Sequence, residues 1–230
     1  MWRASLEMPT SGIAHLQHVL VQEELERARR FYFEDDRRKW IVAHGLLRSL
    51  LGQYLKCNPR SLHFTTNHYG KPLLVSPVGG KRLQFNLSHS GNLVLFAFAY
   101  ESEVGVDVEQ MRADIDYREL AARYFSVREC TAFEALSADL QQEAFFLCWS
   151  RKEAYVKARG KGLSLPLDQF DVSLVPDEPV RLFGSREEPQ AVERWSLYDL
   201  FPARGYAGAL SIEGPSWQVR CWQWQGETRS

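Results

Sequence analysis

The sequence has little cysteine and no long uncharged apolar run. The longest such run, Leu93 to Tyr100, is far too short to span a bilayer, and the first residues include no apolar stretch long enough for a secretion signal. The four cysteines lack the spacing of metal ligands, which predicts reduced, mostly packed thiols at Cys57, Cys130, Cys148 and Cys221. These absences argue against a membrane-spanning or disulfide-stapled protein, and we expect a cytoplasmic one.

An excess of either charge is also missing. The 28 basic and 29 acidic residues leave a net charge of -1, so nothing global favours a nucleic-acid or membrane partner. Basic residues cluster between Arg27 and Lys39, but acidic residues interleave with them, and a solvated helix surface is the commoner outcome. Two catalytic motifs are missing too: there is no G-x-S-x-G around Ser88 or Ser90, and Gly160-Lys161-Gly162 lacks the framing of a Walker A loop.

Hydrophobic periodicity predicts a mixture of helices and strands in each half of the chain. A length of 230 residues with 45% hydrophobic residues is enough to bury a substantial core. We predict turns over residues 9–12, 67–72 and 88–92, helices over 21–33, around 40–51, and over 117–124, 126–136 and 140–158, and strands over 2–7, 61–66, 83–87, 93–100, 104–109, 170–174, 194–198, 206–212 and 217–224. With the best boundary at Glu101-Ser102-Glu103, the sequence predicts an α+β fold of two similar-sized lobes, residues 1–101 and 102–230.

The predicted helix over residues 140–158 has charges on an otherwise apolar surface. Trp149, Glu153 and Lys157 follow one another at positions i, i+4 and i+8, so they line one side of the helix. Phe145 and Phe146 belong to its apolar surroundings, which indicates a central element. Taken alone, Glu153 and Lys157 at this spacing more often form a surface ion pair, but charges on a buried helix need partners or a function.

Two further carboxylates lie on one face of a predicted strand. In Val104-Gly105-Val106-Asp107-Val108-Glu109 the valines alternate with Asp107 and Glu109. Together with Glu153 they offer the oxygen ligands that Mg²⁺ prefers, and Lys157 is placed to hold phosphate oxygens. His89 and Lys71 are further candidate phosphate donors, although an exposed turn histidine or a solvated lysine is the commoner outcome for each. The combination indicates phosphoryl or pyrophosphate chemistry.

Several motifs in order resemble one known family. Phe85-Asn86-Leu87-Ser88-His89-Ser90-Gly91, the strand ending in Glu109, and Phe146 to Lys157 with the following Gly160-Lys161-Gly162-Leu163-Ser164 are similar to the signatures of 4′-phosphopantetheinyl transferases. The match is to the larger, Sfp-like branch. It extends to Gly70-Lys71-Pro72 and Arg30-Phe31-Tyr32, so that it covers most of the chain from about residue 24 to residue 174.

This resemblance implies a fold, a reaction and partners. Such enzymes move the phosphopantetheine arm of coenzyme A onto a serine of an apo acyl, polyketide or peptidyl carrier protein and release adenosine 3′,5′-bisphosphate. Their two α+β lobes are related by a pseudo-twofold axis, with the active site in the cleft between them. A chain of this size is expected to build the cleft alone, as a monomer, whereas members of half this length oligomerise. We expect broad carrier specificity.

The resemblance also implies roles for single residues. Asp107, Glu109 and Glu153 resemble the metal ligands, and Lys157 the lysine that binds the pyrophosphate. His89 resembles the histidine that contacts the phosphates beside Ser88. Lys71 and Arg27 match basic positions that hold the ribose 3′-phosphate, Arg27 only by its distance from Phe31. Glu153, directly or through a water, is the expected acceptor of the carrier serine proton.

Two other functions are weighed against this one. The same carboxylates would suit a metal-dependent phosphatase or nuclease, which usually has more Asp and His ligands and no use for the Asn-Leu-Ser-His-Ser-Gly segment. A nucleic-acid-binding module would bind its ligand through the basic residues between Arg27 and Lys39. Its binding would depend on salt and would be unaffected by Asp107→Ala.

Overall fold

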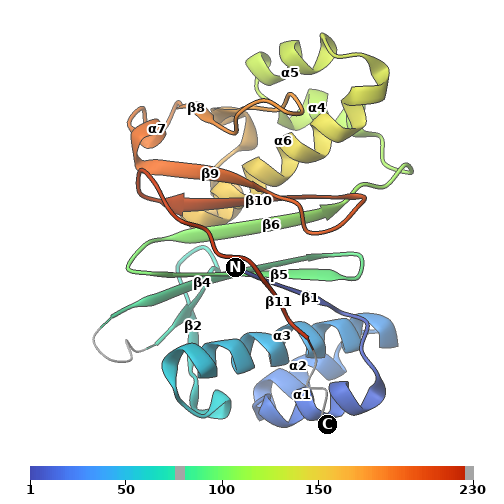
Figure 1. The fold of residues 1–230 in the computed structure, drawn as a ribbon, viewed down its shortest axis with the longest axis vertical. Helices are drawn as coiled ribbons and strands as arrows, with labels where there is room; N and C mark the ends of the chain where they lie inside the picture. Colours follow the sequence, from blue (N-terminus) through green and yellow to red (C-terminus); the bar gives the residue numbers. More distant parts are fainter. Residues whose placement is uncertain (76–80, 226–230) are drawn as a thin grey trace.

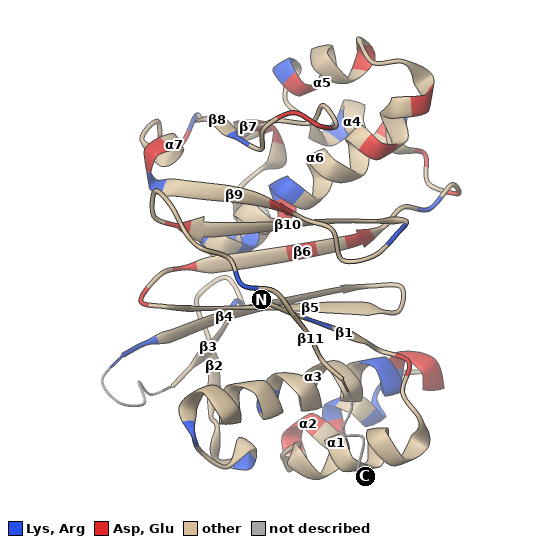
Figure 2. Cartoon of the chain, viewed as in Figure 1, with Lys and Arg blue, Asp and Glu red and all other residues tan. Residues whose placement is uncertain are grey.

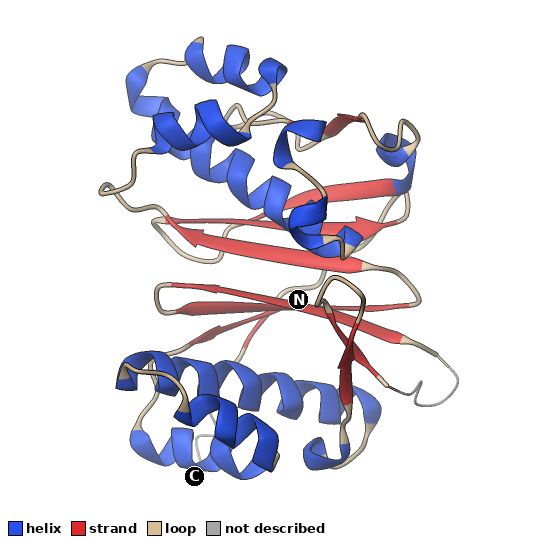
Figure 3. Ribbon diagram, turned by 180° about the vertical axis from the view of Figure 1, so that it is seen from behind, coloured by secondary structure: helices blue, strands red, loops and turns tan. Residues whose placement is uncertain are grey.

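The computed structural model describes residues 1–75 and 81–225, with the side chain of Leu163 left aside. Two sheets lie next to each other across the middle of the molecule, and helices cover the outer side of each (Figure 1). Seen from behind, the layers again run helix, sheet, sheet, helix (Figure 3). The mixed α+β architecture predicted from the sequence is confirmed.

The first sheet has the strand order β11-β1-β5-β4 and belongs mostly to the N-terminal half. Its helices and strands, with the small elements beside them, are β1 (Trp2–Ser5), α1 (Thr10–Val19), α2 (Gln22–Arg29), α3 (Glu34–Leu55), η1 (Pro59–Ser61), β2 (Phe64–Thr66), β3 (Pro72–Leu74), β4 (Leu83–Ser90) and β5 (Leu93–Tyr100). Helix α3 fills the core beneath this sheet with the fully buried side chains of Val42, Leu46 and Leu50.

The second sheet has the order β6-β10-β9 and carries the longest helix of the C-terminal half. The C-terminal half contains β6 (Val104–Gln110), α4 (Tyr117–Tyr124), α5 (Val127–Glu134), α6 (Ala138–Arg159), η2 (Gly162–Ser164), η3 (Leu167–Gln169), β7 (Phe170–Val172), β8 (Leu182–Ser185), α7 (Ala191–Arg194), β9 (Trp195–Leu200) and β10 (Tyr206–Glu213). Strands β7 and β8 pair with each other in a small separate sheet. The last strand, β11 (Trp222–Gln223), returns to pair in parallel with β1, so the chain end joins the first sheet.

Gly105 lets helix α6 cross strand β6 at very short range. A Cβ atom at Gly105 would lie 2.2 Å from both the carbonyl oxygen of Ala154 and the amide nitrogen of Ala158. A side chain there would push the helix off the strand. The close crossing brings the last turns of α6 beside the carboxylates of β6.

The structure corrects three sequence predictions. The turn predicted at residues 9–12 is wrong, because Pro9 stands at the N-cap of α1, where its missing N–H costs nothing, and Ile13 and Leu16 are buried. The turn at 88–92 is wrong for residues 88–90, since β4 continues to Ser90 and its tight turn falls at Gly91, with φ +56°. Of the strand expected over 217–224, only Trp222–Gln223 forms.

Charges of both signs lie on α2 and at the start of α3 (Figure 2). In each helix the acidic positions precede the basic ones, and Glu34 pairs with Arg37 across one turn of α3. No helix within the described residues is long and apolar enough to cross a membrane.

Candidate active site

Strands β4 and β6 are joined by side chains of alternate residues. Ser88 donates from Oγ to Asp107 Oδ1 at 2.9 Å, and Ser90 donates to Glu109 Oε2 at 3.0 Å. Asn86 accepts the amide of Val106 through Oδ1 at 2.9 Å. Because residues two apart on a strand face the same side, the polar side chains of both strands meet along one line.

Lys157 of α6 contacts this row of polar side chains. Its Nζ lies 2.6 Å from Asp107 Oδ1 and 3.0 Å from Ser88 Oγ. The Asp107 side chain is 2% exposed, and its second oxygen, Oδ2, is buried with no hydrogen-bond partner among the described residues. A buried carboxylate oxygen without a partner costs free energy, so a cation or a hydrogen-bond donor beside it would be favourable.

The pKa values of Glu109 and Glu153 are both raised, and Asp107 contributes to each shift. Burial raises the pKa of Glu109 above 4.5, and the charge of Asp107 raises it further. Burial likewise raises the pKa of Glu153, an effect that Lys157 opposes and Asp107 strengthens. Asp107 therefore lies close enough to both glutamates for its charge to affect their pKa values. Within residues 1–75 and 81–225, however, no three His, Cys, Asp or Glu side chains form a ready-made metal site.

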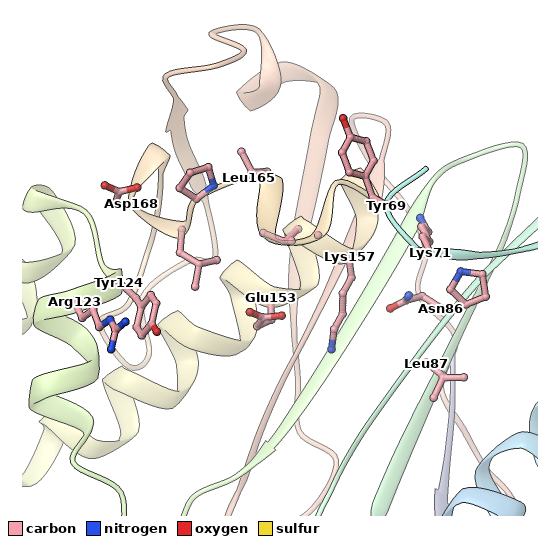
Figure 4. A pocket seen from close by; sticks show the side chains of 17 residues that line it. Tyr69, Lys71, Asn86, Leu87, Arg123, Tyr124, Glu153, Lys157, Leu165 and Asp168 are labelled. Carbon is pink, nitrogen blue, oxygen red and sulfur yellow. The ribbon is translucent and has the colours of Figure 1, made fainter. Parts of the chain in front are cut away.

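A cavity of about 590 Å³ opens beside Glu153 and Lys157. Both side chains reach it from α6, while Arg123 and Tyr124 of α4 line one side and Lys71 the other (Figure 4). Apolar residues complete it, among them Leu87, Val156, Leu165, Pro166 and Leu167. A cavity of this size with a few converging charges is typical of a small-molecule site.

His89, Lys71 and Arg27 lie differently from the central group. His89 is on strand β4 with an exposed side chain, where partial burial and then the charges of Lys157 and Lys39 lower its pKa. Lys71 lines the cavity, but its ammonium is bonded to Glu103. Arg27 stacks its guanidinium over the Trp40 ring at 5.9 Å, and it lines a separate hollow with Arg30.

Several residues of the site were not predicted from the sequence. Ser90, Asn67, Glu103, Arg123 and Tyr124 all contact the site residues or line the cavity. Asn86, Ser88 and Ser90 stand at every second position, so Ser90 could have been predicted to face the site if residues 88–90 are taken as strand. The others lie on surface turns and helices without any distinguishing pattern.

Two family models match the chain, one in each half. The model of the 4′-phosphopantetheinyl transferase N-terminal region matches residues 2–101, and that of the 4′-phosphopantetheinyl transferase superfamily matches residues 103–211. The chain is 38% identical over 224 residues to the 4′-phosphopantetheinyl transferase HetI of Nostoc sp., which covers 97% of this chain and 91% of that protein. The chain belongs to the 4′-phosphopantetheinyl transferase family.

Other relatives place it in the Sfp-like branch of that family. Identity to the 4′-phosphopantetheinyl transferase Sfp of Bacillus subtilis is 36%, over 70% of this chain and 69% of the relative. Identity to the 4′-phosphopantetheinyl transferase psf-1 of Bacillus pumilus is 32%, over 80% and 77%. The phosphopantetheinyl transferases use coenzyme A and transfer its phosphopantetheine group to apo carrier proteins. The phosphatase, nuclease and nucleic-acid-binding alternatives are therefore not favoured.

Proposed function

We propose that this chain transfers the 4′-phosphopantetheine arm of coenzyme A to a serine of an apo acyl, polyketide or peptidyl carrier protein with Mg²⁺ held by Asp107, Glu109 and Glu153. One observation carries the proposal. Asp107 has one oxygen paired with Lys157 while the other is buried and unpartnered within the described residues, beside two carboxylates whose pKa values are raised. A divalent cation would satisfy that oxygen and neutralise the cluster.

An incomplete set of carboxylate ligands suits magnesium, because this ion does not need a closed cage of side chains. Mg²⁺ is usually bound through one or two carboxylates, with water and substrate phosphates completing its shell. That agrees with carboxylates that lie near one another without forming a complete ligand set in the described residues. When bound, the ion would supply positive charge to the pyrophosphate of coenzyme A.

The remaining residues would bind and orient coenzyme A. Lys157 and Ser88 adjoin Asp107 and would hold pyrophosphate oxygens. His89 follows Ser88 directly on β4, so its exposed side chain faces the other side of the strand, and its proposed contact with the phosphates would be made from that side. Arg27 stays the proposed partner of the ribose 3′-phosphate; it lines a hollow with Arg30, whose charge favours an anion there, and with Glu23, whose charge opposes one. The same proposed role for Lys71 has to be weighed against the bonds of its ammonium.

Glu153 is the proposed acceptor of the carrier serine proton. Its side chain lines the cavity, and burial raises its pKa, which makes it a stronger base than an ordinary carboxylate. The serine oxygen would bond to the phosphorus next to the pantetheine arm, and the bond from that phosphorus to the bridging oxygen would break. Adenosine 3′,5′-bisphosphate would leave with the electron pair of that bond, and the serine proton would pass to Glu153, directly or through a water.

The two halves support the proposal of related lobes, residues 1–101 and 102–230, that form one cleft in a monomer. Each half has a 22-residue helix, α3 or α6, that packs on a sheet and ends at a left-handed residue, Lys56 or Gly160. The cavity takes residues from both halves of a single chain. The cysteines, free in the described structure, are compatible with the proposed cytoplasmic location.

The experiment is a transfer assay read by intact mass. The purified protein is incubated with coenzyme A, Mg²⁺ and a panel of apo carriers, and we expect one phosphopantetheine arm on at least one carrier. Chelation of the metal and Asp107→Ala are expected to abolish the gain. The absence of a mass gain on every carrier would refute the proposed function, and full activity after chelation would refute its metal dependence.

A further inference from the structure

The turn over residues 67–72 is fastened to the end of helix α6 by one asparagine. Asn67 accepts the backbone amides of Tyr69 and Lys71 through Oδ1, both at 2.9 Å, so it folds the turn. Its Nδ2 donates to the carbonyl of Gly160 at 2.7 Å. A single side chain thus shapes a turn of the N-terminal half and ties it to a helix of the C-terminal half.

Lys71 makes a second attachment between the same two segments. Its Nζ donates to Glu103 Oε2 at 2.7 Å, to the carbonyl of Ala158 at 3.0 Å and to the carbonyl of Val104 at 3.2 Å. An ammonium has three N–H donors, so these bonds account for all of them. The Lys71 side chain is 6% exposed, which leaves it little room to turn toward a ligand.

Gly160 shows how closely the two segments meet. It ends α6 at φ +63°, and a Cβ atom there would lie 2.9 Å from Lys71 Cδ and 3.0 Å from Asn67 Nδ2. The contact therefore needs glycine both for its backbone and for the space it leaves. The attachment is a packed junction.

The fastened turn forms a wall of the cavity that also holds Glu153 and Lys157. Tyr69, Gly70, Lys71 and Pro72 line it together with Gly160. Because Gly160 follows α6 directly, the junction fixes the wall relative to the helix that carries both charged side chains. The spacing between wall and helix decides how a ligand fits between them.

We infer that Asn67 and Lys71 are positioning residues for coenzyme A: they set the wall of its cavity against α6, and Lys71 acts through the turn without contacting a phosphate. This inference rests on the proposed function. It gives Lys71 a different role from the 3′-phosphate contact that its motif implies.

The first test replaces Asn67 by aspartate. Asn67→Asp keeps the acceptor that folds the turn and removes the donor to Gly160. The matched control is Asn58→Asp, because Asn58 folds another turn by accepting the Arg60 amide. We expect Asn67→Asp to raise the KM for coenzyme A about 3- to 10-fold with kcat within about twofold, as for the loss of one hydrogen bond, and Asn58→Asp to change neither. A KM equal to that of the control would overturn the role of Asn67.

The second test distinguishes positioning from phosphate contact. Lys71→Met is assayed with coenzyme A and with 3′-dephospho-coenzyme A. If Lys71 positions the wall, KM rises by the same factor for both substrates; a rise confined to coenzyme A would show a direct phosphate contact and overturn the inference. Circular dichroism checks that each variant is folded. If Lys71→Met does not fold, the KM of Asn67→Asp alone tests the inference. An inactive wild type would instead refute the proposed function.

Discussion

Lys157 on α6 and Asp107 on β6 form an ion pair across 50 positions of the chain, with 2.6 Å between Nζ and Oδ1. The pair forms where Gly105 lets the helix touch the strand. Only one Asp107 oxygen is used; the other has no partner within residues 1–75 and 81–225. The lysine therefore stabilises the buried carboxylate through one oxygen only, and the second oxygen is the one that the proposed metal would contact.

Replacing Lys157 separates its ion pair with Asp107 from its proposed role in catalysis. We expect Lys157→Met to lower kcat/KM about 100-fold or more, because the positive charge proposed to bind the pyrophosphate is lost, and to destabilise the fold, because Asp107 stays buried and unpaired. Asp107→Asn in the same chain should restore stability but not activity. Urea unfolding and transfer kinetics of both single variants and the double variant check this. A double variant less stable than Lys157→Met would contradict it.

Glu109 is expected to make the metal-free protein less stable at higher pH. Its pKa is raised from 4.5 by burial and then by Asp107, so the folded state keeps the proton to a higher pH than the unfolded chain does. The resulting stability is complete below the unfolded pKa and is lost as pH rises through the folded pKa. Glu109→Gln should therefore raise the melting temperature without metal at about pH 7.5, and this gain should vanish near pH 4.

The control for that experiment is Glu119→Gln, a change at an exposed residue of α4. It should leave the pH dependence as in the wild type. Mg²⁺ should stabilise the wild type more than Glu109→Gln. A lower melting temperature of Glu109→Gln at neutral pH would show that the carboxylate stabilises the fold.

His44 should make the fold sensitive to acid. Burial, opposed by the hydrogen-bonding contact with the Trp40 carbonyl, lowers the pKa of His44 from 6.5 to about 4, while its ring stacks on Trp40 at 3.8 Å. The unfolded chain then binds the proton more readily, so stability present above pH 6.5 is lost as pH falls toward 4. The loss is about 1–2 kcal/mol by pH 5.

The variant His44→Phe keeps a ring on Trp40 and removes the titration. Denaturant unfolding at neutral and acidic pH should show a smaller acid loss than in the wild type. The same change at His15, which is exposed, should leave that loss unchanged. Equal acid losses in wild type and His44→Phe would contradict the role of His44.

Breaking the buried pair of Lys152 and Glu129 should cost far more stability than breaking a surface pair. The two side chains are 0% and 1% exposed and lie 2.7 Å apart, and Lys152 also donates to the carbonyl of Leu167 in the wall of the cavity. Lys152→Met leaves a buried carboxylate and should cost about 3–5 kcal/mol. Arg37→Met breaks the exposed pair with Glu34 and should cost under about 1 kcal/mol. Comparable losses in urea unfolding would contradict this.

Local pattern predicted the elements whose periodicity is strong. The capping box at Ser126 and Glu129 is confirmed, and helix α6 and strands β5 and β6 lie within two residues of their predicted bounds. Helix α1 was missed, because Pro9 and Gly12 are typical of turns, and only packing against α3 shows that Ile13 and Leu16 belong to a core helix.

The chemical groups of the site and their order along the chain could be predicted, because residue type and spacing along a helix or strand are local properties. Which of those groups meet depends on the tertiary structure. It left one Asp107 oxygen without a partner in the described chain, bonded the Lys71 ammonium to Glu103 and two carbonyls, and made Asn67 a link between the halves. Contacts between residues so distant in sequence depend on how helices and sheets pack, and no local pattern records them.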